Sequence, residues 1–397
     1  MRILLAGETY PPDVNGAGVF TCRLAEGLAR RRHEVHVIVP SPSCYSYEAQ
    51  SDGVWLHYLP SHRYRWHPTF HILDLRKGRQ AVTHAMRSVR PEVVHVQAHF
   101  AVGRFAAAQS TRLNIPLVAT NHFMPENLKY QLPFNLPDLL YNRAAALAWR
   151  DLARVFRNAN VITAPTPYAV DLLRKRARIS DALAVSCGVD LAAYPQRTTK
   201  KGDNRQTILF VGRLDPEKHV DEIIDAVAMM DSRVYLRVVG VGRQEPNLRR
   251  QARVRGIDDR VTIVGYLPEE ELLGEYARAD VFCMPGTAEL QSIATLEAMA
   301  SGLPVVAASA KALPSLVTTN VNGALFPPGD VTALADALRY VLDGERVKRM
   351  GEASRLRVQQ HDFSLTLDAY ERIYRDAIQR QEPHYSWRGL PSKNQPD

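Results

Sequence analysis

Short apolar runs and amphipathic segments alternate along the first half of the chain. Apolar residues at Val19, Leu24, Leu28 and Ala29 recur at helical spacing, which predicts a helix over 19–32. The apolar runs have no polar face, which is typical of parallel strands covered on both sides. We therefore predict strands at 3–6, 35–39, 93–96, 117–120 and 161–163. This repetition indicates a doubly wound α/β domain.

A hydrophilic stretch at 196–206 interrupts the pattern and is predicted to be a linker. The same alternation then returns, with strands predicted at 207–211, 235–239, 261–264, 281–284 and 304–307 and helices at 220–230, 269–279 and 293–300. We predict two Rossmann-like domains, 1–195 and 207–360, that face a central cleft, because such sheets bind ligands at their carboxyl ends. An amphipathic helix at 361–381 is predicted to pack back toward the first domain, and 382–397 to form a flexible tail.

Composition narrows the class of protein. The chain has 397 residues, 46% hydrophobic and 23% charged, which suits two globular domains and excludes disordered and fibrous proteins. No run reaches the roughly 18 apolar residues of a membrane-spanning helix. Too few apolar residues precede Glu8 for the core of a signal peptide. Cys22, Cys44, Cys187 and Cys283 lack metal-binding spacing, so we predict a reduced, cytoplasmic protein without a metal site.

The basic excess lies entirely in the first half. Residues 1–199 contain 24 Lys and Arg against 14 Asp and Glu, and the net charge of the whole chain is +8. These arginines either lie scattered over solvated faces or form a surface that meets the phosphates of anionic lipids. The chain has no nucleic-acid-binding motif, so that class of partner is not predicted.

Two stretches combine aromatic and basic side chains and are candidates for acceptor binding at a membrane surface. One contains Tyr64, Arg65 and Trp66, and the other spans 139–158 with Trp149 and Phe156 among its arginines. A core helix with solvated arginines explains the second stretch equally well.

The loop after the first predicted strand contains Gly16 and Gly18 and leads into a helix. Glycines at this position let a phosphate approach the backbone N–H groups of the helix start, where the helix dipole favours an anion. An ordinary flexible turn explains the pattern as well.

Arg213 and Lys218 follow the first strand of the second domain. Two fixed cations at a strand end can neutralise a departing diphosphate as its bond breaks. The alternative is a solvated loop with pairs of acidic and basic side chains.

Glu289 and Glu297 are separated by seven residues. Glu297 lies in an otherwise apolar predicted helix, where an unpaired carboxylate would be costly and the hydroxyl pair of a ribose would satisfy it. Gln291, Ser292 and Ile293 at the helix start offer N–H groups to a phosphate. A capping carboxylate and a solvent-facing one are the alternative.

His122 follows the predicted strand 117–120, with Asn121, Glu126 and Asn127 beside it in the sequence. A residue after a strand end should point into the cleft. A structural histidine is an equally good interpretation.

Gly-Arg-(x)3-Glu-Lys at 212–218 and Glu-(x)7-Glu followed by Ala-Met-Ala-x-Gly-x-Pro-Val at 289–305 resemble the retaining glycosyltransferases of family 4, which have the GT-B fold. Supporting features are Arg-His-Glu-Val at 32–35, in place of the usual Gly-His-x-Val, and a Gly-Val-Asp turn at 188–190. The resemblance covers roughly residues 1–378.

This resemblance implies transfer of a hexose from UDP-glucose, UDP-galactose or GDP-mannose with retention of configuration and without a metal or other cofactor. By position, Arg213 and Lys218 would bind the diphosphate and stabilise the leaving group. Glu297 would hold the ribose, and Glu289 the hydroxyls of the donor sugar.

The resemblance also places His122 beside the transferred sugar and Gly16 or Gly18 against the phosphate. Two departures stand out: the glycine pair is split as Gly-Ala-Gly, and Leu290-Gln291-Ser292 replaces the usual Phe-Gly after the first glutamate.

The segments at 122–127 and 289–293 are similar to those of bacterial members that glycosylate diacylglycerol and phosphatidylinositol-type lipids. We therefore predict hexose transfer to a lipid acceptor by a peripheral enzyme on the inner face of the cell membrane. Transfer to a soluble acceptor, a GT-B epimerase or phosphorylase, and a sugar-nucleotide-binding protein without turnover are the alternatives. The sequence does not specify the oligomeric state.

Overall fold

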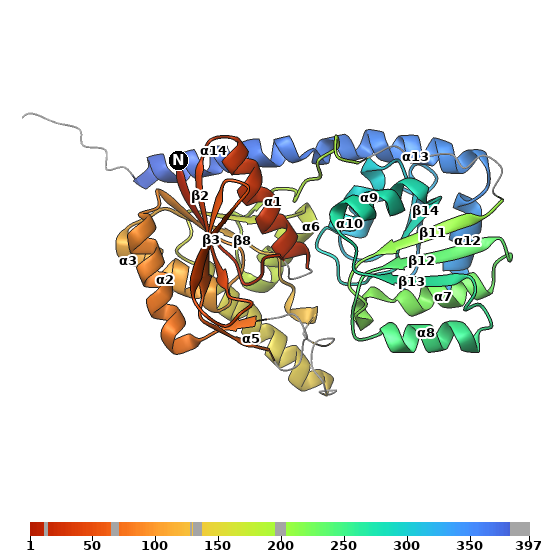
Figure 1. Ribbon diagram of the computed structural model, residues 1–397, viewed down its shortest axis with the longest axis horizontal. Coiled ribbons are helices and arrows are strands. Elements are labelled where there is room, and N and C mark those ends of the chain that lie inside the picture. Colours follow the sequence, from red (N-terminus) through yellow and green to blue (C-terminus); the bar gives the residue numbers. More distant parts are fainter. Residues whose placement is uncertain (12–14, 65–70, 128, 130–136, 195–203, 382–397) are drawn as a thin grey trace, which may run out of the picture.

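Two α/β domains lie side by side, and two long helices run along the same side of the pair (Figure 1). The computed structural model describes residues 1–11, 15–64, 71–127, 129, 137–194 and 204–381. The second domain begins with β11 (Gln206–Val211). Most of the predicted linker and the whole predicted tail lie outside the described residues.

The first domain is built on a sheet of eight described strands. In sheet order they are β10 (Leu183–Ala184), β9 (Val161–Ala164), β8 (Leu117–Thr120), β7 (Val93–Val96), β1 (Arg2–Ala6), β2 (Glu34–Pro40), β4 (Val54–Leu59) and β3 (Tyr47–Ser51). All pairs are parallel except β3 and β4, which form an antiparallel edge. A small antiparallel pair, β5 (Ser61–Arg63) and β6 (His71–Leu73), stands apart from this sheet.

Alternate side chains of the central strand β1 enter two different cores. Ile3 and Leu5 share a core with α1 (Gly16–Arg30) and α14 (Phe363–Gln381). Leu4 and Ala6 point to the other face, which is covered by α2 (Leu75–Val89), α3 (Ala101–Leu113), α5 (Asp138–Phe156), α6 (Pro167–Leu172) and η2 (Leu173–Ala177). Because both faces are buried, these strands have no polar side in the sequence.

The second domain repeats this plan with a parallel sheet. In sheet order its described strands are β13 (Val261–Gly265), β12 (Val234–Val239), β11, β14 (Val281–Met284), β15 (Val305–Ala308) and β16 (Gly323–Phe326). The helices are α7 (Val220–Ala228), α8 (Glu245–Val254), α9 (Glu269–Arg278), α10 (Ile293–Ala300), α11 (Leu313–Leu316), α12 (Val331–Val341) and α13 (Glu345–Val358). Figure 1 shows α9, α10 and α13 above the sheet and α7 and α8 below it.

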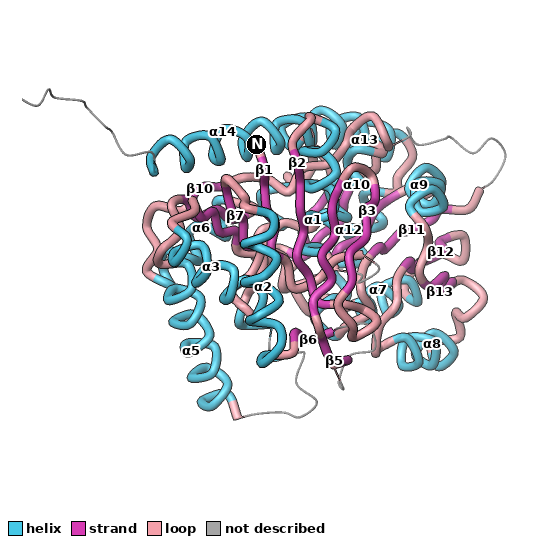
Figure 2. Tube along the Cα trace, turned by 60° about the vertical axis from the view of Figure 1, so that its left-hand side comes forward, coloured by secondary structure: helices cyan, strands magenta, loops and turns pink. Residues whose placement is uncertain are grey.

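The last helix, α14, returns to the first domain, where Phe363, Leu367, Tyr370 and Tyr374 enter its core. Figure 2 shows α14 extending across the top of β1 and β2, away from α13. The turn η4 (Gln359–His361) connects the two helices.

The segment that returns to the first domain, before α14, is hydrogen-bonded to the segment that leaves it, near Val189. Val189 N–H donates to the carbonyl of His361 (2.9 Å), and Phe363 N–H donates to the carbonyl of Val189 (3.0 Å). Gly188 has a φ of +71°, and a β-carbon there would lie 2.5 Å from Thr366 Oγ1. Only glycine therefore lets the two passages of chain approach each other this closely.

The predicted doubly wound architecture is confirmed in both domains. The antiparallel β3–β4 edge was not predicted, because β3 is mostly exposed and has no apolar run. Trp149 and Phe156 are buried in the core of the first domain, as the alternative of a core helix with solvated arginines predicts, and not on a surface stretch. Within the part of the chain that the structure describes, no helix is long and apolar enough to cross a bilayer.

The packing of α14 predicts a large loss of stability for Leu367→Ala. Leu367 is 7% exposed, and removing its buried methyl groups leaves a cavity against α1. We expect the free energy of unfolding to fall by about 2–5 kcal/mol, measured by urea denaturation. Leu365 is on the same helix and 52% exposed, so Leu365→Ala is a matched control that should change stability by less than about 0.5 kcal/mol. Equal effects of the two substitutions would contradict this packing.

Candidate active site

The starts of α1 and α10 meet where the carboxyl ends of the two sheets face each other. A β-carbon on Gly16 would lie 3.9 Å from Cδ1 of Ile293. Asn15 caps α1, since its Oδ1 accepts the N–H of Gly18 at 2.9 Å. The N–H of Gly18 is therefore used within the first domain, and Gly16 is the glycine that faces the second domain.

Both predicted cations of the second domain are paired with acids. Arg213 donates to Asp215 Oδ2 at 2.6 Å and to Glu217 Oε1 at 2.9 Å, and both carboxylates are buried. The Lys218 ammonium donates to Glu289 Oε1. The structure thus brings Lys218 and Glu289 together, although they are 71 residues apart. The predicted alternative of acid–base pairs is present, but in a largely buried site rather than a solvated loop.

The segment before α10 is attached to the first domain. Gln291 accepts the N–H of Cys187 at 2.7 Å and donates to Ser186 Oγ at 2.8 Å. The carbonyl of Leu290 accepts a hydrogen bond from Thr166 Oγ1 at 2.8 Å. The side chain of Gln291 is therefore an interdomain contact, and only its backbone is left for the predicted phosphate contact.

Ser292 has a φ of +76°, a conformation that favours glycine. It lies where the family resemblance leads us to expect a Phe-Gly pair, so the backbone turn is kept without the glycine. Its hydroxyl caps α10, with Oγ 3.4 Å from the N–H of Thr295. The N–H groups of the first turn, from Ile293 onward, have no carbonyl one turn earlier in the helix and are suited to an anion.

Glu297 is 5% exposed and is already paired within the protein, whereas the sequence suggested a ribose as one partner for this carboxylate. Its Oε1 accepts a hydrogen bond from Arg23 Nη2 of α1 at 2.8 Å, and its Oε2 accepts one from Tyr276 at 2.9 Å. These partners were not predicted, because residues from another domain and another helix are not visible in the local pattern. The alternative of a solvent-facing carboxylate is wrong, because Glu297 is buried.

His122 is held by Gln97, which follows β7. His122 Nε2 lies 3.0 Å from Gln97 Oε1, and an amide oxygen can only accept, so Nε2 carries the hydrogen. Burial lowers the pKa of His122 to about 4. The imidazole is thus neutral near pH 7, with Nδ1 as its acceptor atom. Its ring packs on Phe20 of α1, with centroids 4.9 Å apart.

The candidate acceptor-binding residues differ in their hydrogen bonding and burial. Asn121 Nδ2 and Asn127 Oδ1 are buried without a hydrogen-bond partner among the described residues. Glu126 is engaged by Trp149, whose Nε1 donates to its Oε1 at 3.2 Å. Tyr64 lies half-buried after β5, whereas Arg65 and Trp66 lie outside the described residues.

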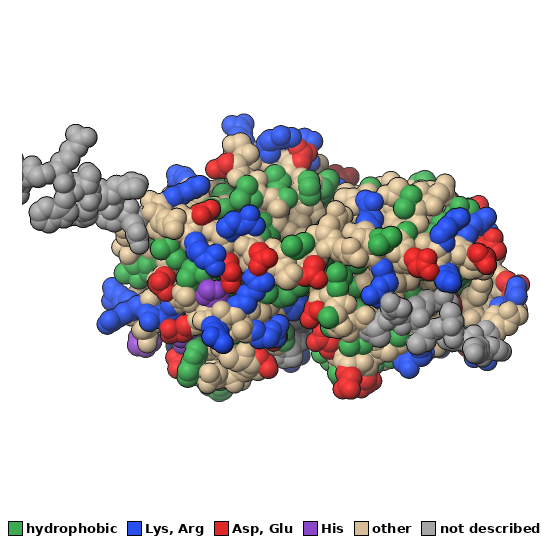
Figure 3. Space-filling model, turned by 90° about the horizontal axis from the view of Figure 1, so that it is seen from above, with side chains coloured by type: hydrophobic (Ala, Val, Ile, Leu, Met, Phe, Trp, Pro, Cys, Tyr) green, Lys and Arg blue, Asp and Glu red, His purple; other side chains and the backbone are tan. Residues whose placement is uncertain are grey.

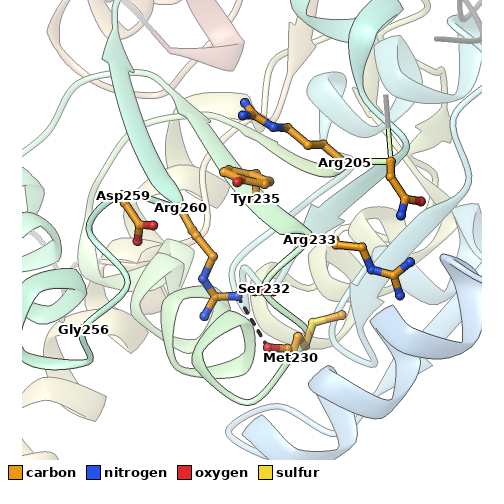
Figure 4. A pocket seen from close by; sticks show the side chains of 9 residues that line it. Arg205, Met230, Ser232, Arg233, Tyr235, Gly256, Asp259 and Arg260 are labelled. Carbon is orange, nitrogen blue, oxygen red and sulfur yellow. Dashed lines mark hydrogen bonds between the residues drawn. The ribbon is translucent and has the colours of Figure 1, made fainter. Parts of the chain in front are cut away.

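A hollow in the second domain lies at the amino end of its sheet, opposite the carboxyl end that bears the candidate site. Arg205, Arg233 and Tyr235 line it, next to the amino ends of β11 and β12 (Figure 4). Arg260 donates from this hollow to the carbonyl of Met230 at 3.4 Å. The hollow is separate from the carboxyl-end site described above, and none of the predicted site residues lines it.

Sequence reasoning missed Arg23 and Gln97. Arg23 stands between the core residues Phe20 and Leu24 of α1, so a cation close to an apolar face was the available signal. Gln97 is a polar residue directly after a buried strand, the position that drew attention to His122.

Two protein families match the chain. The family described as Glycosyltransferase Family 4 matches residues 14–193, and the family described as Glycosyl transferases group 1 matches residues 195–357.

Relatives and solved structures agree with these matches. A GDP-mannose-dependent alpha-mannosyltransferase of Mycobacterium tuberculosis is 29% identical over 86% of this chain and 88% of its own. An alpha-monoglucosyldiacylglycerol synthase of Acholeplasma laidlawii is 23% identical over 82% of this chain and 85% of its own. A sucrose-phosphate synthase from Thermosynechococcus elongatus superimposes with a TM-score of 0.77 at 20% identity, over 95% of this chain and 99% of that chain. The predicted GT-B fold is confirmed.

The contact between Gln97 and His122 predicts a shifted titration in Gln97→Glu. A carboxylate facing Nε2–H favours the imidazolium, so the pKa of His122 should rise above its value of about 4. Buried His95, whose side chain also lies near Gln97, is the other titratable group to be assigned. We expect nuclear magnetic resonance of the imidazole nitrogens to show the shift, with Gln97→Met as a control that keeps the low value. Identical titrations in the wild type and Gln97→Glu would refute the contact.

Proposed function

Since this chain is a glycosyltransferase that joins a family 4 domain to a group 1 domain, we propose that it moves a hexose from a nucleotide sugar to a lipid acceptor, with retention of the α configuration. The observation that carries this proposal is the meeting of Lys218–Glu289 and the start of α10 with the start of α1. Together these groups provide a cation, a carboxylate and helix N–H groups close to the junction of the two domains.

On the donor side, the bond from the anomeric carbon to the diphosphate oxygen breaks, and its electron pair stays on the phosphate. Lys218 and Arg213 would stabilise that charge, helped by the N–H groups at the start of α10. Both cations are held by carboxylates, so they are positioned before the donor binds. Glu289 would accept hydrogen bonds from the donor sugar.

On the side of the first domain, neutral His122 would accept a hydrogen bond from a hydroxyl of the transferred sugar through Nδ1. Asn121 and Asn127 would bind acceptor hydroxyls with the amide atoms that have no partner among the described residues. We assign no protein nucleophile. The acceptor oxygen would attack on the face of the leaving phosphate, which takes the acceptor proton.

We propose GDP-mannose as the donor to test first. The GDP-mannose-dependent alpha-mannosyltransferases of Mycobacterium tuberculosis and Mycolicibacterium smegmatis are each 29% identical to this chain. UDP-glucose is the second donor, because Anabaena HepE, which shares the fold with a TM-score of 0.75, was solved with UDP-glucose.

The lipid acceptor is supported by α5, which extends from the first domain on the side opposite α14 (Figure 1). Its exposed residues include Leu139 and Leu147, 65% and 62% exposed. Arg143, Arg150 and Arg154 are exposed on the same helix. Apolar side chains flanked by cations suit the surface of an anionic membrane. On the face that bears α14, Lys and Arg are instead interspersed with acidic side chains (Figure 3).

Loss of the leaving-group cation should abolish most turnover. We expect Lys218→Ala to lower kcat by about 100-fold or more while the circular dichroism spectrum stays unchanged. Lys348→Ala, which removes an exposed lysine of α13, is the control and should retain wild-type rates. Wild-type turnover in Lys218→Ala would remove this residue from the mechanism.

The function itself is tested by donor turnover across GDP- and UDP-sugars, with and without vesicles that contain diacylglycerol and an anionic lipid. We expect one donor to be turned over faster with vesicles, and the gain to disappear when Arg143, Arg150 and Arg154 are replaced by Ala. Replacing Arg372, Arg375 and Arg380 of α14 removes the same charge from the opposite face and should keep the gain. A rate of turnover that does not change with vesicles would favour a soluble acceptor. The absence of turnover with every donor would favour a protein that only binds nucleotides.

A further inference from the structure

Arg23 of the first domain contacts the carboxylate that is expected to bind the donor's ribose in the second. Besides its 2.8 Å hydrogen bond to Glu297, Arg23 Nη2 lies 3.2 Å from the Tyr194 hydroxyl and 3.4 Å from Glu269 Oε1. The resemblance to family 4 provides no role for this residue. Four segments, α1, the end of the first domain, α9 and α10, thus meet around one guanidinium.

Glu297 needs a counter-ion wherever it stays ionised, because it is buried. The other cations of the site are paired elsewhere: Arg213 with Asp215 and Glu217, and Lys218 with Glu289. The hydroxyls of a ribose are neutral and cannot replace a cation. Arg23 is therefore expected to remain on Glu297 when the donor binds.

The Glu297 carboxylate can accept from more than one partner. A carboxylate has about four acceptor positions; Arg23 and Tyr276 use one on each oxygen, and the hydroxyl of Tyr194 interacts with the same carboxylate. An acceptor position therefore remains for a ribose hydroxyl. Arg23 and Tyr276 together fix the plane of the carboxylate, so its free lone pairs have set directions.

We propose that Arg23 is a positioning residue of the donor site, which holds the Glu297 carboxylate for the ribose from the opposite domain. This inference rests on the proposed function, in which Glu297 binds the ribose. The donor site is then complete only when α1 lies against α10, as the hydrogen bond from Arg23 to Glu297 shows that it does here. Binding of the nucleotide and approach of the domains favour each other by linkage.

The test compares nucleotides with and without the ribose hydroxyls. Isothermal titration calorimetry would measure binding of GDP, UDP and their 2′,3′-dideoxy forms to the wild type and Arg23→Ala. We expect Arg23→Ala to weaken the better-bound ribonucleotide about tenfold, the size expected for loss of a charged hydrogen bond. The dideoxy form should bind both proteins alike within about twofold, because its binding does not use Glu297. Arg23→Lys keeps the cation and should restore part of the affinity.

Arg31 is a matched control. It lies at the end of the same helix and pairs with Asp368 of α14, within the first domain. Arg31→Ala should bind all the nucleotides as the wild type does. Unchanged affinity in Arg23→Ala would overturn the inference. So would tighter binding, since Arg23 would then compete with the ribose, or an equal loss for the dideoxy form, since Arg23 would then act on phosphate or on folding.

Glu297→Ala separates this inference from the proposed function. If Glu297→Ala loses ribonucleotide affinity and Arg23→Ala does not, the donor site stands and only the role of Arg23 fails. If Glu297→Ala itself binds the ribonucleotides normally, the ribose site and the donor side of the proposed function fail together.

Discussion

The last helix supplies two tyrosines that complete the hydrogen-bonded polar centre of the first sheet, where His95, Thr120 and Thr163 also bond to one another. Tyr374 hydroxyl lies 2.7 Å from His95 Nδ1, and Tyr370 hydroxyl lies 3.2 Å from the hydroxyls of both Thr120 and Thr163. A buried polar group that loses a hydrogen-bond partner lowers the free energy of unfolding. The stability of the first domain therefore depends on the end of the chain. The same strands, β7 and β8, lead into Gln97 and His122. The packing of α14 on these strands therefore also helps to position those two side chains.

The charges of the candidate site are balanced in pairs before any ligand arrives. Lys218 lies against Glu289, Arg213 against two acids and Arg23 against Glu297. A diphosphate that enters this site shares cations already held by carboxylates, so its binding energy is the difference between two sets of charged contacts. Such a site binds its donor less tightly than free cations would, but it keeps the cations in place, and a leaving group gains most from cations whose position is already fixed.

The sequence predicted the strands well because burial on both faces is a local property. It also found the loops at the strand ends, because turn and helix-start chemistry is local too. The sequence could not predict ion pairs between distant segments. Glu297 and Arg23 are 274 residues apart, and nothing near either one indicates the other. The same limit applied to α5, where periodicity showed a helix with apolar and basic residues but did not show that Trp149 faces the core and Leu147 the solvent.

The chain passes between the domains twice, and at Val189 the two passages are hydrogen-bonded to each other. Any change in the angle between the domains must bend the chain near this crossing. The hydrogen bonds that Gln291 and Thr166 make across the domains involve polar atoms that water or a ligand can also satisfy. Polar contacts can be exchanged for ligand contacts at little net cost, whereas a large apolar interface would have to be exposed to water before the donor could enter. An enzyme that must open for each donor is thus better served by these polar contacts, beside which Leu290 of the same segment packs into the core of the first domain.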